Sequence, residues 1–483
     1  MTDRIVVPLI LRGKVITDHL IEIPGRGGNI TFYTPDAHQY LDQIPLGHPR
    51  KMADLYSITF DEILDFLEEL GHRLDIKTNQ HMQWARELTY AASPMTPGII
   101  DFFYETVGGQ FNRDFLRDMA DVDIGIDKLE GWVEEQVATG PLTRVRCFGS
   151  KALHIAAGNG PAGTTIALIR NALTRSDAII KSPSNDPFTG PAILQTMCDI
   201  DADHPLTKHM SIAYWRGGDE EFEKRLYQPH NVEKIIAWGG YTSVKHVTKY
   251  IQPGLELISM DPKRSASVVG EEAFKDEVKM KDAAIRFASD FGGFNQVGCT
   301  NSRVAYVQTG TDDDGLEVAN RFAQMAYDAL ATFPERYSSK PKDYSPELRG
   351  KVNALRLEDD FYKVIGGEDD EGAVIVSQFA DAIDFMPELD HRTVNVVPID
   401  DIDEFLDAID SYTQSIGVYP ESLKDELRDQ MPLYGCQRII SLGYTSAVTM
   451  AGPHDALEPM ARMVKWVVDE ISDPETRPPM WLP

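Results

Sequence analysis

The sequence is poor in cysteine and in positive charge. Its 483 residues include four cysteines, Cys147, Cys198, Cys299 and Cys436. So few do not form a disulfide framework, and a reducing cytoplasmic location is expected. Lysine and arginine total 47 against 76 acidic residues, a formal net charge of −29. This charge argues against a nucleic-acid partner, because phosphates would be repelled, and any site for an anionic cofactor must be locally basic.

Long apolar runs are missing as well. The N-terminal run Ile5–Leu11 contains Pro8 and lacks the pattern of a signal peptide. No stretch is long enough to span a membrane, so no transmembrane segment is predicted. Acidic runs such as Glu368–Glu371 lack the alternating ligand spacing of a calcium loop, which favours solvated surface and predicts no metal site. The 42% hydrophobic content is enough for about two or three domains.

The first 150 residues divide into a strand-rich and a helix-rich part. Residues 1–50 alternate apolar and polar positions around glycine and proline, which predicts short antiparallel strands. Apolar residues then recur at helical spacing, as at Ile63, Phe66, Leu67 and Leu70. Further helices are predicted near Gln80–Ala92, Pro97–Val107 and Arg113–Met119.

From Gly149 strands alternate with helices, which predicts an α/β fold with a doubly wound parallel sheet. The predicted strands are Ala152–Ala157, Ala178–Lys181, Met210–Tyr214 and Lys234–Trp238, and the predicted helices are Thr164–Leu173, Gly190–Cys198 and Thr242–Tyr250. A second α/β block runs from about Lys263 to Gln437, with helices at Asp282–Phe291 and Leu316–Leu330. An amphipathic helix is predicted at Leu457–Ile471, docked on the body or on a second subunit.

One cysteine lies in a turn of small residues between a helix and a strand. The segment reads Gly-Gly-Phe-Asn-Gln-Val-Gly-Cys-Thr-Asn-Ser-Arg from Gly292 to Arg303, with Cys299 eighth. For a cysteine taken alone, a buried structural thiol is the more common role. This string, however, resembles the nucleophile segment of the aldehyde dehydrogenase superfamily. Within the superfamily the chain looks most like the LuxC-type acyl-CoA reductases, and ordered motifs carry the resemblance over about Leu153 to Ile409.

Two glycine turns compete for the cofactor. Gly158–Gly163 formally matches the G-x-G-x-x-G dinucleotide fingerprint between a strand and a helix. The acid expected after the next strand is missing, and Lys181 stands there. The resemblance gives the second interpretation, which we favour: Asn159 is a catalytic asparagine, Lys181 faces the adenosine ribose, and the pyrophosphate lies near Gly239-Gly240.

The resemblance implies a full set of site residues. Cys299 and Asn159 are the catalytic pair. The cofactor-binding residues are Ala157, Gly158, Lys181, Ser182, Ser184, Trp238, Gly239, Gly240, Ser243 and Glu388, the last facing the nicotinamide ribose. Ser184 stands where NAD-preferring relatives often carry an acid, so NADPH is the predicted cofactor. Cys436 is the rival nucleophile because it too adjoins a glycine, and His454 is expected to be structural rather than a proton donor.

The implied activity is NADPH-dependent reduction of a medium- or long-chain acyl-CoA, or acyl carrier thioester, to the fatty aldehyde through an acyl group on Cys299. The alternative is an aldehyde dehydrogenase that oxidises an aldehyde to the free acid. A third possibility is a binding or assembly component without activity, against which intact Cys299 and Asn159 count. An acyl-transferring partner protein and a homo-oligomer are further expectations.

The resemblance also implies a division into domains. Residues 1–262 hold a helical region and the cofactor-binding domain, and residues 263–438 form the catalytic domain. Residues 439–483 pack back on the first domain or on a partner subunit. In hydrolytic relatives a glutamate activates water, and the alignment places Met260 at its position. Lys263 and Arg264 are candidates for contacts with coenzyme A phosphates, although ordinary surface cations are at least as common.

Overall fold

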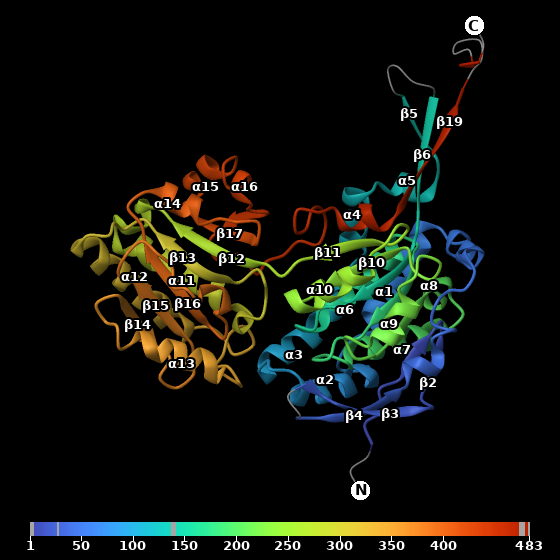
Figure 1. The fold of residues 1–483 in the computed structure, drawn as a ribbon, viewed down its shortest axis with the longest axis horizontal. Helices are drawn as coiled ribbons and strands as arrows, with labels where there is room; N and C mark the ends of the chain where they lie inside the picture. Colours follow the sequence, from blue (N-terminus) through green and yellow to red (C-terminus); the bar gives the residue numbers. More distant parts are fainter. Residues whose placement is uncertain (1–3, 27–28, 137–141, 473–478, 482–483) are drawn as a thin grey trace. The chain divides into compact units, whose positions relative to one another are not determined.

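The computed structural model describes the chain except residues 1–3, 27–28, 137–141, 473–478 and 482–483. The chain forms two compact units (Figure 1). Unit 1 comprises residues 1–92, 103–260 and 450–483, and unit 2 comprises residues 93–102 and 261–449. The assignment of cofactor binding and catalysis to separate domains stays a prediction.

Unit 1 is built on a seven-stranded sheet of order β11-β10-β7-β8-β9-β1-β2. Its strands are β1 (Leu9–Leu11), β2 (Lys14–Ile16), β7 (Lys151–Ile155), β8 (Asp177–Lys181), β9 (Met210–Ala213), β10 (Lys234–Trp238) and β11 (Glu256–Met260). The five strands from β11 to β9 are parallel, as the alternation of strands and helices predicted, and the N-terminal pair β1 and β2 adds an antiparallel edge. A separate hairpin, β3 (Leu20–Pro24) with β4 (Thr31–Pro35), confirms the antiparallel strands expected near the N-terminus.

The helices of unit 1 follow the predicted spacing closely. They are α1 (Phe60–Arg73), α2 (Gln80–Ala92), α4 (Arg113–Asp123), α5 (Ile126–Glu130), α6 (Pro161–Leu173), α7 (Thr189–Asp201), α8 (Pro205–Lys208), α9 (Glu220–Leu226), α10 (Tyr241–Val247) and α17 (Pro459–Met463). Helix α3 (Pro97–Thr106) contains residues of both units. In α1, Thr59 caps the first turn and Glu62 completes a capping box, which satisfies N–H groups that the helix itself leaves free.

The prediction of a helix at Leu457–Ile471 is wrong. After the short helix α17 the chain forms strand β19 (Lys465–Ile471), which pairs antiparallel with β6 (Leu142–Phe148), and β5 (Val133–Gln136) completes a three-stranded arm. The run Trp466-Val467-Val468 favours extended backbone, because branched and aromatic side chains pack well on a pleated surface. Pairing with β6, more than 300 residues earlier in the chain, overrides the amphipathic pattern.

Unit 2 holds a second seven-stranded sheet, of order β14-β15-β16-β13-β12-β17-β18. Its strands are β12 (Arg264–Val269), β13 (Ser302–Val307), β14 (Tyr362–Gly366), β15 (Ala373–Ser377), β16 (Thr393–Pro398), β17 (Thr413–Tyr419) and β18 (Arg438–Ser441). Its helices are α11 (Glu277–Gly292), α12 (Asp313–Leu330), α13 (Pro346–Leu355), α14 (Ile402–Asp407), α15 (Glu421–Leu427) and α16 (Met431–Tyr434). Only β14 runs antiparallel to its neighbour, β15.

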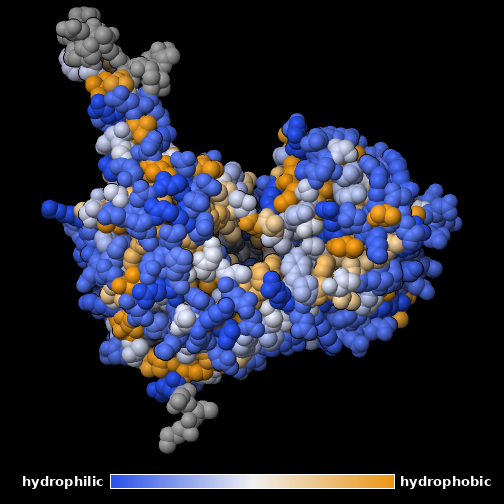
Figure 2. Space-filling model, turned by 180° about the vertical axis from the view of Figure 1, so that it is seen from behind, coloured by the Kyte–Doolittle hydropathy of each residue, from blue (hydrophilic) through white to orange (hydrophobic). Residues whose placement is uncertain are grey.

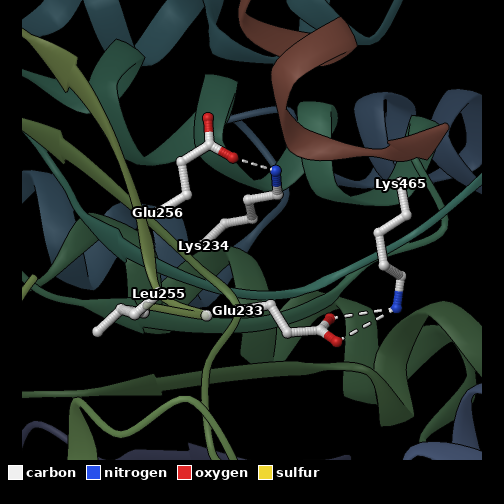
Figure 3. A pocket seen from close by; sticks show the side chains of 6 residues that line it. Glu233, Lys234, Leu255, Glu256 and Lys465 are labelled. Carbon is white, nitrogen blue, oxygen red and sulfur yellow. Dashed lines mark hydrogen bonds and ion pairs between the residues drawn. The ribbon is translucent and has the colours of Figure 1, made fainter. Parts of the chain in front are cut away.

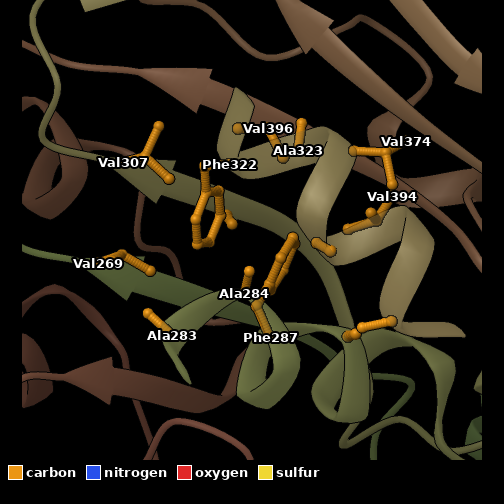
Figure 4. Close-up of a cluster of buried hydrophobic side chains, with 14 of the residues drawn as sticks. Val269, Ala283, Ala284, Phe287, Val307, Phe322, Ala323, Val374, Val394 and Val396 are labelled. Carbon is orange, nitrogen blue, oxygen red and sulfur yellow. The ribbon is translucent and has the colours of Figure 1, made fainter. Parts of the chain in front are cut away.

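Alternate residues of each central strand enter opposite cores. On β13, Ala305 and Val307 pack with α11 and α12 in the core drawn in Figure 4. Val304 and Tyr306 pack on the other face with α14 and α15. A sheet that is covered on both faces carries strands that are apolar along nearly their whole length. Strand β13 is such a strand, and it begins three residues after Cys299.

Candidate active site

The turn that carries Cys299 contains three consecutive left-handed residues. Helix α11 ends at Gly292, and Phe294, Asn295 and Gln296 follow with φ of 49°, 55° and 65°. None of them is glycine, and such backbone costs on the order of 1 kcal/mol or more for each residue. The sequence suggested that glycines would shape this turn. Instead, a Cβ added at Gly292 or Gly293 would lie within 3 Å of Leu330 or Tyr337, so these two glycines serve close packing inside unit 2.

Side-chain hydrogen bonds hold the strained turn. The buried Gln296 amide donates to the Ser302 and Thr393 carbonyls at 2.9 Å each, and its oxygen accepts from the Thr393 N–H at 3.0 Å. Phe294 stacks on Phe102, with ring centroids 5.6 Å apart. Surrounding contacts thus fix a conformation that the local chain would not adopt by itself.

Removing the Gln296 amide should destabilise unit 2. In Gln296→Ala the Ser302 and Thr393 carbonyls lose this donor, while the Thr393 N–H keeps the Asp390 carbonyl at 3.0 Å as a partner. Each lost bond to a buried group costs about 1–3 kcal/mol, so we expect a loss of about 2–6 kcal/mol. The measurement is the urea-unfolding midpoint. Gln324→Ala is the matched control, because Gln324 is exposed and bonds only to Asp328 among the described contacts, and it should change stability by less than about 0.5 kcal/mol. Equal midpoints for the two variants would contradict this role of Gln296.

Cys299 is partly exposed, and the backbone on both sides of it is fixed. Its carbonyl accepts from the Ser265 hydroxyl of β12 at 2.8 Å. The Gly298 N–H donates to the Asn301 side chain at 3.0 Å, and the Asn301 amide donates to the Asp290 and Gly293 carbonyls. The thiol therefore stands on a turn tied both to the end of α11 and to the central strand of the sheet.

The other three thiols differ from Cys299 in their environment. Burial raises the thiol pKa of Cys147, Cys198 and Cys436 to about 11. Cys147 and Cys436 are buried, whereas Cys198 is only partly buried. A high thiol pKa leaves little thiolate at neutral pH, and the thiolate is the nucleophile. These environments argue against Cys436, the rival nucleophile.

Two arginines that interact with Cys299, Arg303 and Arg438, were assigned no role in the sequence analysis. Burial lowers the pKa of Arg303 to about 10, and the attraction of Asp390 and then of Cys299 opposes this shift. Burial also lowers the pKa of Arg438, against the attraction of Asp290 and then of Cys299. Arg303 closes the motif of the nucleophile turn, so a sequence signal was present. Arg438 lies 139 residues after Cys299 in the chain, and the pairing of β17 with β18 brings it into the site of unit 2.

Unit 1 gathers the predicted cofactor residues at one sheet edge. Ile155, Lys181 and Ala237 are register partners on β7, β8 and β10. The chain leaves these parallel strands at their carboxyl ends, where ligands bind in open α/β sheets. The residues that follow at this edge are Ala157, Gly158, Asn159, Ser182, Ser184, Trp238, Gly239, Gly240 and Ser243. Asn159 and Ser184 are exposed, Ala157 and Ser182 are buried, and Asn159 makes no hydrogen bond with the described part of the chain.

The two glycine turns have different surroundings. A Cβ at Gly158 would lie 1.8 Å from the Asn185 side-chain oxygen, so protein atoms fill the space beside this glycine. Beside Gly240 no described atom lies within 4 Å of such a Cβ. The turn Gly239-Gly240 opens helix α10 without a side-chain cap. Free N–H groups and open space suit a phosphate group at this turn better than at the first.

Lys181 supplies the local positive charge that the acidic chain requires. Its Nζ lies 5.5 Å from the centre of the Trp215 ring, and it forms no hydrogen bond or ion pair with any residue that the structure describes. Burial lowers the pKa of Lys181 to about 8, and the attraction of Glu223 opposes this shift. A partly buried ammonium group without hydrogen bonds to the described residues fits an anionic ligand such as a phosphate.

Two further predicted residues have their own neighbours. Glu388 belongs to unit 2, where its exposed carboxylate pairs with Lys351, and its contact with a ribose stays a prediction. His454, expected to be structural, belongs to unit 1 and packs edge-on against Trp238 with ring centroids 5.5 Å apart. No sequence motif links this histidine to the glycine turn that follows Trp238.

A pocket of unit 1 lies apart from these residues. Glu233, Lys234, Glu256 and Lys465 line it, and they pair with one another, Lys465 with Glu233 at 3.2 Å and Lys234 with Glu256 (Figure 3). Because the charges cancel inside the pocket, it offers no net attraction for an ionic ligand. Among the described residues, no group of three or more His, Cys, Asp or Glu side chains is placed to hold a metal ion, and no helix is long and apolar enough to cross a membrane.

A family model described as acyl-CoA reductase (LuxC) matches residues 55–466. The chain belongs to this family. It is therefore an aldehyde-forming oxidoreductase of the acyl-CoA reductase (LuxC) family, as the resemblance predicted. A long-chain acyl-protein thioester reductase of Aliivibrio fischeri is 27% identical over 429 residues, covering 87% of this chain and 84% of that protein. A second reductase of this name, from Photobacterium leiognathi, is 25% identical over 427 residues, covering 86% and 83%.

The fold prediction is also confirmed. Aldehyde dehydrogenase 21 from Physcomitrella patens superposes with a TM-score of 0.74 over 97% of this chain and 99% of that one. Its sequence identity is only 11%, so this likeness establishes the architecture alone. The acyl-CoA reductase thus uses an aldehyde-dehydrogenase-like fold, and its reductive chemistry implies a nicotinamide cofactor.

Proposed function

We propose that this acyl-CoA reductase converts a medium- or long-chain acyl thioester to the fatty aldehyde with NADPH, by way of an acyl group on Cys299. The observation that carries the proposal is a partly exposed Cys299 on a strained, fixed turn in a reductase whose other thiols have pKa values raised to about 11. The names of the relatives support an acyl-protein thioester as the substrate, and acyl-CoA is the alternative acyl donor.

The chain's own groups provide the acyl-transfer step. The Cys299 thiolate attacks the thioester carbonyl, a new C–S bond forms, and the carrier leaves as a thiolate that takes a proton from solvent. The oxyanion that forms needs two donors, for which the Cys299 N–H and the Asn159 amide are our candidates. NADPH, when bound, supplies hydride to the acyl carbon. Collapse of the resulting thiohemiacetal releases aldehyde and returns the Cys299 thiolate.

The cofactor is assigned to the edge of unit 1. Lys181 and Ser184 would face the adenosine ribose and its 2′-phosphate, and Gly239-Gly240 would approach the pyrophosphate. Serine is small and neutral and does not repel a phosphate as a carboxylate would. The unpaired ammonium of Lys181 and the open turn at Gly240 support this assignment. Ser184→Glu should therefore shift the preference toward NADH.

Binding of NADPH should weaken at alkaline pH. Below a pKa of about 8 Lys181 is an ammonium ion, and above it the group loses the charge that attracts the 2′-phosphate. The dissociation constant for NADPH, measured by fluorescence titration, should rise above pH 8. The rise should be up to about tenfold for each pH unit and about ten- to a hundredfold in all. The dissociation constant for NADH should change little over the same pH range. Lys181→Met should weaken NADPH binding and remove its pH dependence, whereas parallel curves for the two cofactors would contradict the assignment.

Intact-mass measurement tests the acyl-transfer proposal directly. Wild-type protein mixed with acyl-CoA and no reductant should gain the mass of one acyl group. Addition of NADPH should remove that mass and release aldehyde. A protein that never gains an acyl group from acyl-CoA or from an acyl-protein would contradict the proposal.

The arm of unit 1 supports the proposal of a homo-oligomer. Every residue of β19 is exposed, including Trp466 and Val468, and the arm projects from the body of unit 1 (Figures 1 and 2). An apolar strand at the edge of a small sheet invites pairing with another chain. We assign this arm to contact with a second copy, and an acyl-transferring protein remains a further proposed partner.

A further inference from the structure

Arg303 lies under the nucleophile turn with one nitrogen left without a partner. Its Nη2 donates to the Gln296 carbonyl at 3.1 Å and lies 3.5 Å from the Gly298 carbonyl. Its Nη1 is buried and has no hydrogen-bond partner in the described part of the chain. A buried guanidinium that leaves a donor unused is costly unless it interacts with a negative charge. Cys299 follows Gly298 directly, so its thiolate is a charge that this turn can present.

Arg438 approaches the same cysteine through a chain of hydrogen bonds. Its Nη1 donates to the Ser415 hydroxyl at 3.2 Å, and the Ser415 N–H donates to the Ser265 hydroxyl at 3.2 Å. The Ser265 hydroxyl in turn donates to the Cys299 carbonyl at 2.8 Å. Arg438 also donates to the Thr445 carbonyl at 2.8 Å, so its position is fixed on two sides.

Asp290 is a buried carboxylate that attracts Arg438. Its Oδ1 accepts from the Thr445 N–H and hydroxyl, each at 3.0 Å. Glycine at 417 leaves room for it, because a Cβ there would lie 2.4 Å from the Asp290 carboxylate. Burial raises the pKa of Asp290 to about 6, so at neutral pH its charge offsets part of the Arg438 charge.

We propose that Arg303 and Arg438 are positioning residues that keep Cys299 in the thiolate form, and that Asp290 limits their effect. The proposal rests on the proposed function, because it concerns the same nucleophile. The thiol proton passes to water, and the two guanidinium groups stabilise the charge that remains on sulfur. Two other charged groups of the surrounding elements have interactions of their own: Asp390 attracts Arg303, more strongly than Cys299 does, and Arg264 at the start of β12 pairs with Asp410 at 2.6 Å.

The test is the pH dependence of Cys299 alkylation by iodoacetamide, read by peptide mass spectrometry without acyl donor or cofactor. The ordinary thiol pKa is about 8.5, and we expect the wild-type midpoint below it. Arg303→Met and Arg438→Met should each raise the midpoint by about one unit, which slows alkylation at pH 7 about tenfold. Asp290→Asn should shift it in the opposite direction. Arg303→Lys, which keeps the charge, should recover most of the wild-type midpoint.

Arg356→Met is the matched control. Arg356 is also partly buried in unit 2 and donates to two backbone carbonyls, Val364 and Gly366, and its loss should leave the midpoint unchanged. The proposal would be overturned if the alkylation midpoint shifted in the same direction in Arg303→Met, Arg438→Met and Asp290→Asn. It would also be overturned if the midpoint shifted in neither arginine-to-methionine variant. Failure of the proposed function is distinguishable, because it would appear as a wild-type protein that takes no acyl group on Cys299 whatever its thiol midpoint. If an arginine-to-methionine variant does not fold, two variants still test the proposal: Arg303→Lys should keep the midpoint near the wild-type value, and Asp290→Asn should lower it.

Discussion

Replacing Cys299 by alanine should abolish both the acyl adduct and aldehyde formation. The side chain supplies the only bond between enzyme and acyl group in the proposed sequence of steps, and removal of a catalytic nucleophile can cost about 10⁶-fold in kcat. The fold should survive, because Cys299 is only partly buried and alanine keeps the carbonyl that accepts from Ser265. Intact mass with acyl-CoA measures the adduct, and NADPH oxidation measures the reduction.

Cys198→Ala is the matched control for this prediction. Cys198 is also partly buried, but it lies in helix α7 of unit 1, and burial raises its thiol pKa to about 11. The control should retain the adduct and the rate. An adduct that persists in Cys299→Ala would place the acyl group elsewhere and remove the basis of both the proposed function and the arginine proposal.

Local pattern was enough to predict the elements that build the two sheets. Strands β7, β8 and β10 lie within about three residues of their predicted bounds, because continuous apolar runs between glycine-rich turns indicate buried parallel strands. Their register was not predicted residue by residue, yet it follows from the parallel arrangement that Lys181 and the turn after Trp238 share one edge. Order along the chain and parallel pairing thus placed the cofactor candidates.

Features that depend on contacts between residues far apart in the chain could not be predicted from the sequence. The helix expected at Leu457–Ile471 is a strand because β6 offers a partner, and amphipathic spacing carries no information about that partner. The left-handed backbone at Phe294–Gln296 is stable only because residues such as Thr393 and Phe102 hold it. Arg438 and Asp290 both form tertiary hydrogen bonds with Thr445, and neither belongs to a motif with a stated role.

Without NADPH the acyl-enzyme should persist rather than hydrolyse. Met260 stands at the place of the water-activating glutamate in hydrolytic relatives, and it is fully buried at the end of β11 in a cluster with Ile258 and Met463. A thioether cannot take a proton from water, and general-base assistance is typically worth about a hundred- to ten-thousandfold. We therefore expect the rate of free fatty acid release without NADPH to be at most about one-hundredth of the rate of aldehyde formation with NADPH. The measurement is the product split with and without NADPH.

The residue after Met260 is the one nearby acid to exclude. Strand β11 ends at Met260, and Asp261 is an exposed residue beyond the strand. Its carboxylate lies 3.9 Å from the Lys263 ammonium, which favours a charged side chain held at the surface. Asp261→Asn should therefore leave the slow hydrolysis unchanged. Rapid release of free acid that requires Cys299 and disappears in Asp261→Asn would instead identify Asp261 as a base and assign the enzyme to the hydrolytic alternative, because water would then compete with hydride for the same acyl group.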